Sequence, residues 1–106
     1  MNAAERLWSA LATQNWDGVV AQFHDNASVE WPHEDRRLGV ADYVAEQRAR
    51  PGGHGLEVRR VVSDGKIVAI EAAVGAARCA GFYDLHDGRI AYAVEFWVGA
   101  GLSAAV

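Results

Sequence analysis

Apolar residues recur at helical spacing in three stretches of the chain. The first stretch covers residues 3–13, and its apolar face consists of Ala4, Leu7, Trp8 and Leu11. Asn15 follows it and has a side chain that can cap a second, shorter helix. The third stretch begins after Gly39 and ends near Arg50, where basic residues favour the last turn of a helix. The pattern therefore predicts three helices in the first half of the chain.

The other stretches alternate between apolar and polar residues or are rich in β-branched and aromatic ones, which is typical of β-strands. A helix end is expected at residues 24–26, a short strand at residues 27–31 and a charged loop at residues 33–38. Four further strands form two hairpins, because Asp64-Gly65 and Asp87-Gly88 are strong turn signals between apolar runs. This order of elements predicts an α+β fold with an antiparallel sheet.

The last expected strand is apolar on both of its faces. Alternation places Ile90, Tyr92, Val94, Phe96 and Val98 on one face and Ala91, Ala93, Glu95 and Trp97 on the other. Three helices can cover only one face of the sheet, so we expect the other face to pack against a second copy of the chain. The sequence therefore favours a homodimer.

The composition fits one domain spanning residues 1–106, because a chain of this length with 51% hydrophobic residues can bury a single core. The formal net charge of -4 argues against a nucleic-acid partner, which would need a basic face. No window approaches the roughly 18 apolar residues of a membrane span. Cys79 is the only cysteine, which excludes an internal disulfide and favours a reducing compartment. We expect a cytoplasmic protein that binds neither nucleic acid nor membranes.

Several residue strings occur in a fixed order along the chain. They are Asn15-Trp16-Asp17, Phe23-His24-Asp25-Asn26-Ala27 leading to Val29-Glu30-Trp31-Pro32, Leu38-Gly39, Asp87-Gly88-Arg89-Ile90 and Glu95-Phe96-Trp97. Their order and spacing resemble the nuclear transport factor 2 superfamily, in particular its SnoaL-like and ketosteroid-isomerase-like members. The resemblance implies a cone in which a curved antiparallel sheet and three N-terminal helices enclose a hydrophobic pocket. It also implies frequent dimerisation through the outer sheet face.

The polar groups of the best-known relatives are missing at the matching positions. Trp31 lies where steroid isomerases of this superfamily have a general-base aspartate, and Leu7 lies where they have an oxyanion-hole tyrosine. Their acidic oxyanion partner falls near Ala80 or Gly81. Steroid isomerisation by the family mechanism is therefore not expected. The arginine and two aspartates of limonene-epoxide-hydrolase relatives align near Ala72, Val74 and Glu95, of which only Glu95 keeps a carboxylate.

Glu95 is the first candidate for a catalytic residue, because it is a carboxylate between apolar neighbours in a strand. Loss of hydration beside Trp97 would make it a usable acid or base near neutral pH. The alternative is that Glu95 faces water or pairs with an arginine near the cone mouth. His33 is the second candidate, as a general acid or base at the end of the first strand, with an exposed loop histidine as the alternative.

Aromatic residues are the first candidates for binding a substrate. Trp31 and Trp97 should lie on the concave face, where their flat rings suit a planar or polycyclic ligand, and the Tyr83 hydroxyl could reach the cavity as a donor. Core packing is the alternative for all three. With the apolar residues expected beside them, the substrate-binding set is Leu7, Val29, Trp31, Tyr83, Ala93 and Trp97.

The sequence contains no metal-ligand spacing, phosphate-binding loop or serine-nucleophile motif, so no metal or other cofactor is expected. Two functions remain open. The first is a SnoaL-like enzyme that uses acid/base chemistry for isomerisation, cyclisation or hydration of a hydrophobic ring substrate. The second is a non-catalytic module of the same fold that binds a hydrophobic ligand or dimerises.

Overall fold

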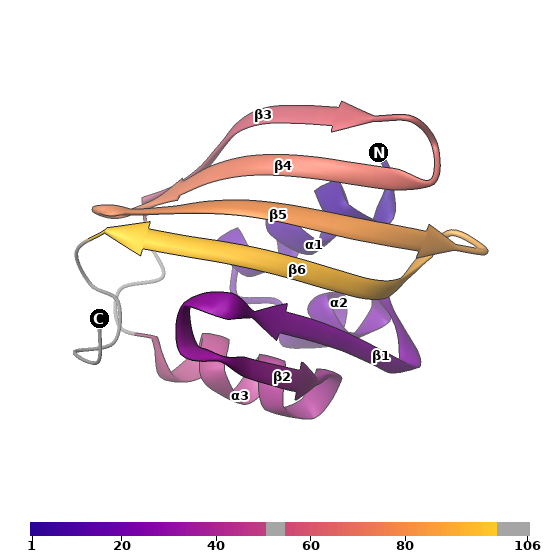
Figure 1. Ribbon diagram of the computed structural model, residues 1–106, viewed down its shortest axis with the longest axis horizontal. Helices are drawn as coiled ribbons and strands as arrows, with labels where there is room; N and C mark the ends of the chain where they lie inside the picture. Colours follow the sequence, from indigo (N-terminus) through magenta and orange to yellow (C-terminus); the bar gives the residue numbers. More distant parts are fainter. Residues whose placement is uncertain (51–54, 100–106) are drawn as a thin grey trace.

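The computed structural model describes residues 1–50 and 55–99 of the chain. In these residues the helices are α1 (Ala3–Ala12), α2 (Trp16–Ala21) and α3 (Val40–Ala49), with a short 3-10 turn, η1 (Pro32–Glu34). The strands are β1 (Phe23–Trp31), β2 (Arg36–Gly39), β3 (Leu56–Ser63), β4 (Ile67–Val74), β5 (Ala77–His86) and β6 (Arg89–Gly99). Figure 1 shows one curved sheet with the helices against a single face. The α+β fold with three helices is confirmed.

The six strands form one sheet in the order β2-β1-β6-β5-β4-β3 (Figure 1). Neighbouring strands are antiparallel except for β1 and β6, which run parallel. The expectation of a purely antiparallel sheet is wrong at this pairing. Tight turns force neighbours to be antiparallel, but β1 and β6 are far apart in sequence and no turn constrains their direction. The sequence contains no local signal for such a pairing.

Two strand boundaries also differ from the expectation. Strand β1 begins at Phe23, so residues 24–26 belong to the strand and do not form a helix end. Residues 36–39 form β2, where a loop was expected, and only Leu38 is buried among them. This strand lies at the sheet edge, where charged side chains are common because they discourage pairing with other chains. Its charged composition therefore resembles that of a loop.

Local signals explain why the helices form where they do. Asn2 and Glu5 make a capping box at the start of α1, and the apolar face of that helix is buried as the periodicity predicts. Asn15 caps α2 by accepting a hydrogen bond from the backbone N–H of Gly18 at 3.0 Å. Helix α3 buries Tyr43 and Gln47. Residues 51–54, where the sequence suggests that the third helix ends, lie outside the described residues.

The hairpin between β5 and β6 sets the positions of the most important side chains. Its turn is made by Asp87 and Gly88, with φ values of 51° and 79°, as the Asp-Gly signal predicts. The register places Gly81 opposite Glu95 and Cys79 opposite Trp97. Because Glu95 and Trp97 are two residues apart, both project to the helix-covered side of the sheet.

The opposite side of β6 is largely exposed. Phe96 and Val98 are 46% and 63% exposed, and Phe96 packs edge-to-face on Phe82 of β5. Ile90 is buried, contrary to the alternation expected for β6, because an irregularity after Asp84 shifts the pairing of β5 with β6 at that end. None of the helices in residues 1–50 and 55–99 combines the length and the apolar character needed to cross a bilayer.

Candidate functional site

Glu95 is fully buried and its carboxylate accepts four hydrogen bonds from aromatic side chains. Oε1 accepts from the indole Nε1 of Trp31 at 3.0 Å and of Trp97 at 3.2 Å. Oε2 accepts from the hydroxyl of Tyr43 at 2.9 Å and of Tyr83 at 2.6 Å. An ionised carboxylate has about four lone-pair positions, so these donors use its full capacity. The alternative that Glu95 faces water is wrong.

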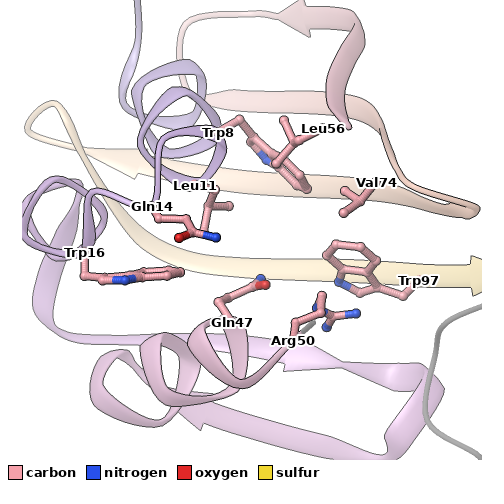
Figure 2. Close-up of a pocket in the computed structure, with 9 residues that line it drawn as sticks. All are labelled: Trp8, Leu11, Gln14, Trp16, Gln47, Arg50, Leu56, Val74 and Trp97. Atoms are coloured by element: carbon pink, nitrogen blue, oxygen red, sulfur yellow. The ribbon is translucent and has the colours of Figure 1, made fainter. Parts of the chain in front are cut away.

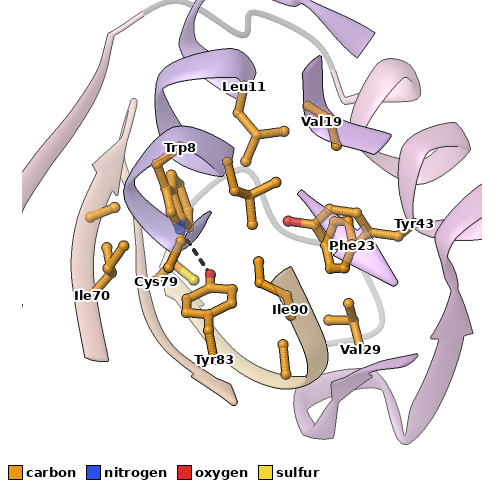
Figure 3. Close-up of a cluster of buried hydrophobic side chains, with 14 of the residues drawn as sticks. Trp8, Leu11, Val19, Phe23, Val29, Tyr43, Ile70, Cys79, Tyr83 and Ile90 are labelled. Atoms are coloured by element: carbon orange, nitrogen blue, oxygen red, sulfur yellow. Dashed lines mark hydrogen bonds between the residues drawn. The ribbon is translucent and has the colours of Figure 1, made fainter. Parts of the chain in front are cut away.

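The four donors come from four different parts of the fold. Trp31 ends β1, Tyr43 comes from α3, Tyr83 from β5 and Trp97 from β6. The hydrogen-bonded group extends to α1, because the Trp8 indole donates to the Tyr83 hydroxyl at 2.8 Å (Figure 3). We call these six residues, Trp8, Trp31, Tyr43, Tyr83, Glu95 and Trp97, the carboxylate cluster.

Gly81 makes room for this arrangement. It lies opposite Glu95, and a Cβ atom there would come within 2.6 Å of the Cε2 and Cζ atoms of the Tyr83 ring. Such a contact is far inside van der Waals distance, so any side chain at this position would displace Tyr83. The absence of a side chain at Gly81 therefore allows the phenol to reach the carboxylate.

Burial keeps both phenols protonated. It raises the pKa of Tyr43 and of Tyr83 well above the usual value, and the charge of Glu95 raises each pKa further. Both hydroxyl groups therefore remain donors at physiological pH. Burial, followed by the charge of Glu95, likewise raises the pKa of the Cys79 thiol, which makes it a core residue and not a nucleophile.

The guanidinium group of Arg50 lies near the indole rings of both Trp31 and Trp97. The Arg50 guanidinium carbon is 4.3 Å from the ring centroid of Trp97 and 5.6 Å from that of Trp31. Both rings donate from their edges to Glu95, so the cation and the carboxylate contact the same two indoles. A guanidinium stacked on indole is favourable by itself, and its charge also offsets that of the buried anion.

Three polar side chains beside the cluster have buried atoms without a hydrogen-bond partner in the described part of the chain. These atoms are Nδ1 and Nε2 of His33, Nε2 of Gln47 and Nε of Arg50. The His33 ring lies 5.6 Å from that of Trp31, and its Nε2 is 3.7 Å from Glu34, beyond hydrogen-bond distance. Burial lowers the pKa of His33, which favours its neutral form.

A small pocket lies between α1, α3 and β6, beside the carboxylate cluster (Figure 2). Its lining consists of Trp8, Leu11, Gln14, Trp16, Gln47, Arg50, Leu56, Val74 and Trp97. The cavity volume is about 30 Å³, whereas an apolar cavity of about 150 Å³ is needed to hold benzene. The interior of the cone is therefore filled mainly by its own aromatic rings.

The structure places the expected site residues in two groups. Trp97 lines the pocket, and Leu7, Val29, Trp31, Tyr83 and Ala93 are buried in the core without lining it. Neither catalytic candidate lines the pocket: Glu95 accepts a hydrogen bond from Trp97, and the His33 ring lies next to the ring of Trp31. No three His, Cys, Asp or Glu side chains gather into a possible metal site in residues 1–50 and 55–99.

Sequence reasoning missed three residues of α3 and its end. Tyr43, Gln47 and Arg50 follow the spacing i, i+4, i+7, which places them on one face of a helix. Tyr43 reaches Glu95, while Gln47 and Arg50 line the pocket. A stripe of polar groups on the buried side of a helix was the available signal, because an ordinary core-facing stripe is apolar.

The SnoaL-like domain family model matches residues 4–93 of the chain. The chain belongs to the SnoaL-like family. A putative ketosteroid isomerase from Kribbella flavida is 27% identical and has a TM-score of 0.77, with 92% of this chain and 76% of that chain covered. An NTF-2 like protein of unknown function from Burkholderia xenovorans is 22% identical and has a TM-score of 0.82, with 96% and 84% covered.

A third solved structure, an LEH-like epoxide hydrolase from M. tuberculosis, is 24% identical to this SnoaL-like chain with a TM-score of 0.69. The match covers 91% of this chain and 80% of that chain. A search of curated proteins finds no match. The resemblance to the nuclear transport factor 2 superfamily is confirmed, and the fold is one that proteins described as isomerases and hydrolases share.

Proposed function

We propose that this SnoaL-like protein binds a small cyclic ligand in the pocket beside Trp97 and that Glu95 holds the wall of this pocket in place. The proposal rests on the hydrogen bonds that the Glu95 carboxylate already accepts. All four acceptor positions of its carboxylate are used by rings of the same chain, so no position is left for a substrate proton. The buried donors without partners lie beside the pocket instead.

Three of the nine residues that line the pocket are tryptophans. Trp8 and Trp97 form two of its walls, with ring centroids 6.0 Å apart and planes inclined at 35°. Flat aromatic walls bind cyclic ligands by area burial and stacking. The enclosed volume holds only one edge of such a ligand, and the remainder would lie at the mouth, where Gln14 is exposed.

Filling the pocket should abolish binding. Val74 is half-buried and lines it, so the substitution Val74→Phe would place a ring in the space that the ligand needs. We expect cyclohexanone and indole to shift the NMR signals of the Trp16 and Trp97 indole N–H groups in the wild type, and Val74→Phe to remove these shifts.

The control is Val62→Phe on β3, because Val62 is 64% exposed and lies outside the pocket lining. This variant should bind like the wild type. If neither probe shifts the Trp16 and Trp97 signals at millimolar concentration, or if Val74→Phe binds as well as Val62→Phe, the proposed site is wrong.

Acid/base catalysis is the second candidate function. It would cover isomerisation, cyclisation or hydration of a hydrophobic ring substrate, with His33 or Glu95 as acid or base. The observation that favours it is the unpartnered, mainly neutral imidazole of His33 beside Trp31. Glu95 could take part only after a ligand displaced one of its four donors. The Kribbella protein is described as a putative ketosteroid isomerase and the M. tuberculosis protein as an epoxide hydrolase, which are activities of this kind.

Proton transfer can be tested without knowing the substrate. We expect the protein to catalyse deuterium exchange at the α-carbon of tetralone in heavy water, and His33→Gln to slow it about 100-fold. The exchange rate should stay constant as the pH falls below 6.5, the ordinary pKa of histidine. The reason is that a base works in its deprotonated form and the pKa of His33 is lowered. His86→Gln, at an exposed position, is the control for surface histidines. Exchange at the buffer rate, or equal rates in the two variants, would exclude His33 catalysis.

We further propose that the protein is a homodimer through the outer face of its sheet. Phe82, Phe96, Val98 and Ile67 leave apolar surface exposed there. Light scattering after gel filtration should give twice the chain mass of 11.4 kDa. Phe96→Lys should give the monomer, whereas Val20→Lys, on the exposed side of α2, should not. A wild-type monomer at micromolar concentration would refute the dimer.

A further inference from the structure

We infer that the pocket recognises a carboxylate, so that its ligand is a small cyclic carboxylic acid whose anionic group is bound by Arg50 and Gln47. The inference rests on the proposed function in using the same pocket. It adds the chemical class of the ligand and names the two side chains that would select it.

The first observation is where unpartnered polar atoms occur. Buried polar side-chain atoms in folded proteins nearly always have a hydrogen-bond partner, and each exception needs a physical reason. Among residues 1–50 and 55–99, all such exceptions belong to His33, Gln47 and Arg50. Gln47 is only 9% exposed. Gln47 and Arg50 both line the pocket (Figure 2).

The second observation is the chemistry of these atoms. The atoms concerned are the amide Nε2 of Gln47 and the guanidinium Nε of Arg50, and both are hydrogen-bond donors. The Gln47 side chain also lies close enough to the Tyr43 hydroxyl to act against the rise in the pKa of that phenol. A carboxylate supplies two acceptor oxygens in one plane. It therefore matches two donors better than a ketone or an ether, which supplies one acceptor atom.

The third observation is the charge of the lining. None of the nine lining residues is acidic, and Arg50 is the one charged residue among them. Arg50 makes no ion pair with an acidic side chain of the described residues. Its guanidinium lies over the Trp97 ring, an arrangement that leaves the edge N–H groups available for an anion. The only charge among the lining residues is therefore positive, in a chain whose net charge is -4.

Two simpler roles for Arg50 and Gln47 lead to different binding results. If Arg50 serves only to offset the charge of Glu95 across the Trp97 ring, its removal destabilises the fold but gives no ligand preference. If a water molecule satisfies Gln47 and Arg50, for which a cavity of about 30 Å³ has room, then charged and neutral ligands bind equally well.

Matched ligand pairs separate these cases. Benzoate and benzamide have nearly the same shape and differ in charge, as do cyclohexanecarboxylate and its amide. For the wild type, we expect each acid to bind about tenfold more tightly than its amide, because a charge-assisted hydrogen bond is stronger than a neutral one. Binding is measured by calorimetry and by the NMR shifts of the Trp16 and Trp97 indole N–H groups.

The variants assign the preference to its residues. Arg50→Met keeps an apolar stem on Trp97 and should remove the preference for the acid, while Arg48→Met, at an exposed position of the same helix, should keep it. Gln47→Glu places a second carboxylate in the pocket and should abolish binding of the acids while amide binding remains. This second variant tests the inference even if Arg50→Met is unfolded.

The outcomes distinguish this inference from the function on which it rests. Equal affinity for acids and amides, or an acid preference that Arg50→Met and Gln47→Glu both retain, overturns the carboxylate site and leaves ligand binding intact. If neither acids nor amides bind the wild type, the proposed function is wrong and the inference is wrong with it.

Discussion

The four hydrogen bonds to the Glu95 carboxylate are the constraint on which the rest of the structure depends. A charged group taken out of water loses several kcal/mol of hydration free energy that other interactions must replace. Here two indoles and two phenols replace the water contacts, and the Arg50 guanidinium lies over the Trp97 ring. Because the donors come from β1, α3, β5 and β6, the carboxylate can be satisfied only when these elements are packed together.

The same interactions determine where a ligand can bind. Bulky rings directed at Glu95 occupy the centre of the cone. The remaining space is the small pocket that Trp97 lines, and Gln47 of α3 and Arg50 at the end of that helix line it too. Glu95 affects the pocket only indirectly, because its hydrogen bond holds Trp97, which lines the pocket. In the proposed function, the donors of Gln47 and Arg50 contact the ligand from the pocket lining.

Much of the fold could be predicted from the sequence because its signals are local. Asn15 caps a helix, and Asp87-Gly88 makes a turn, using residues that are adjacent in the chain. The parallel pairing of β1 with β6 joins residues more than sixty positions apart and has no local signal. The edge strand β2 was missed because charges suit both a loop and a strand edge.

The site could be predicted only in part for a related reason. A charge inside an apolar strand identified Glu95, but its four donors depend on how the helices pack against the sheet. Trp31 and Tyr83 were expected to line a cavity, and their rings instead fill it by hydrogen bonding to the carboxylate. The positions of Gln47 and Arg50 in the pocket lining could not be predicted, because their helical spacing alone does not distinguish a pocket wall from a solvated face.

The free energy of unfolding of Tyr83→Phe, measured in urea, tests the central claim most directly. The substitution removes the shortest hydrogen bond to Glu95 and the acceptor of the Trp8 indole. Relative to Tyr92→Phe, which removes a hydroxyl from the outer side of the sheet, we expect a loss of about 2 kcal/mol. Equal stability of the two variants would contradict the account, because Glu95 would then not depend on its donors.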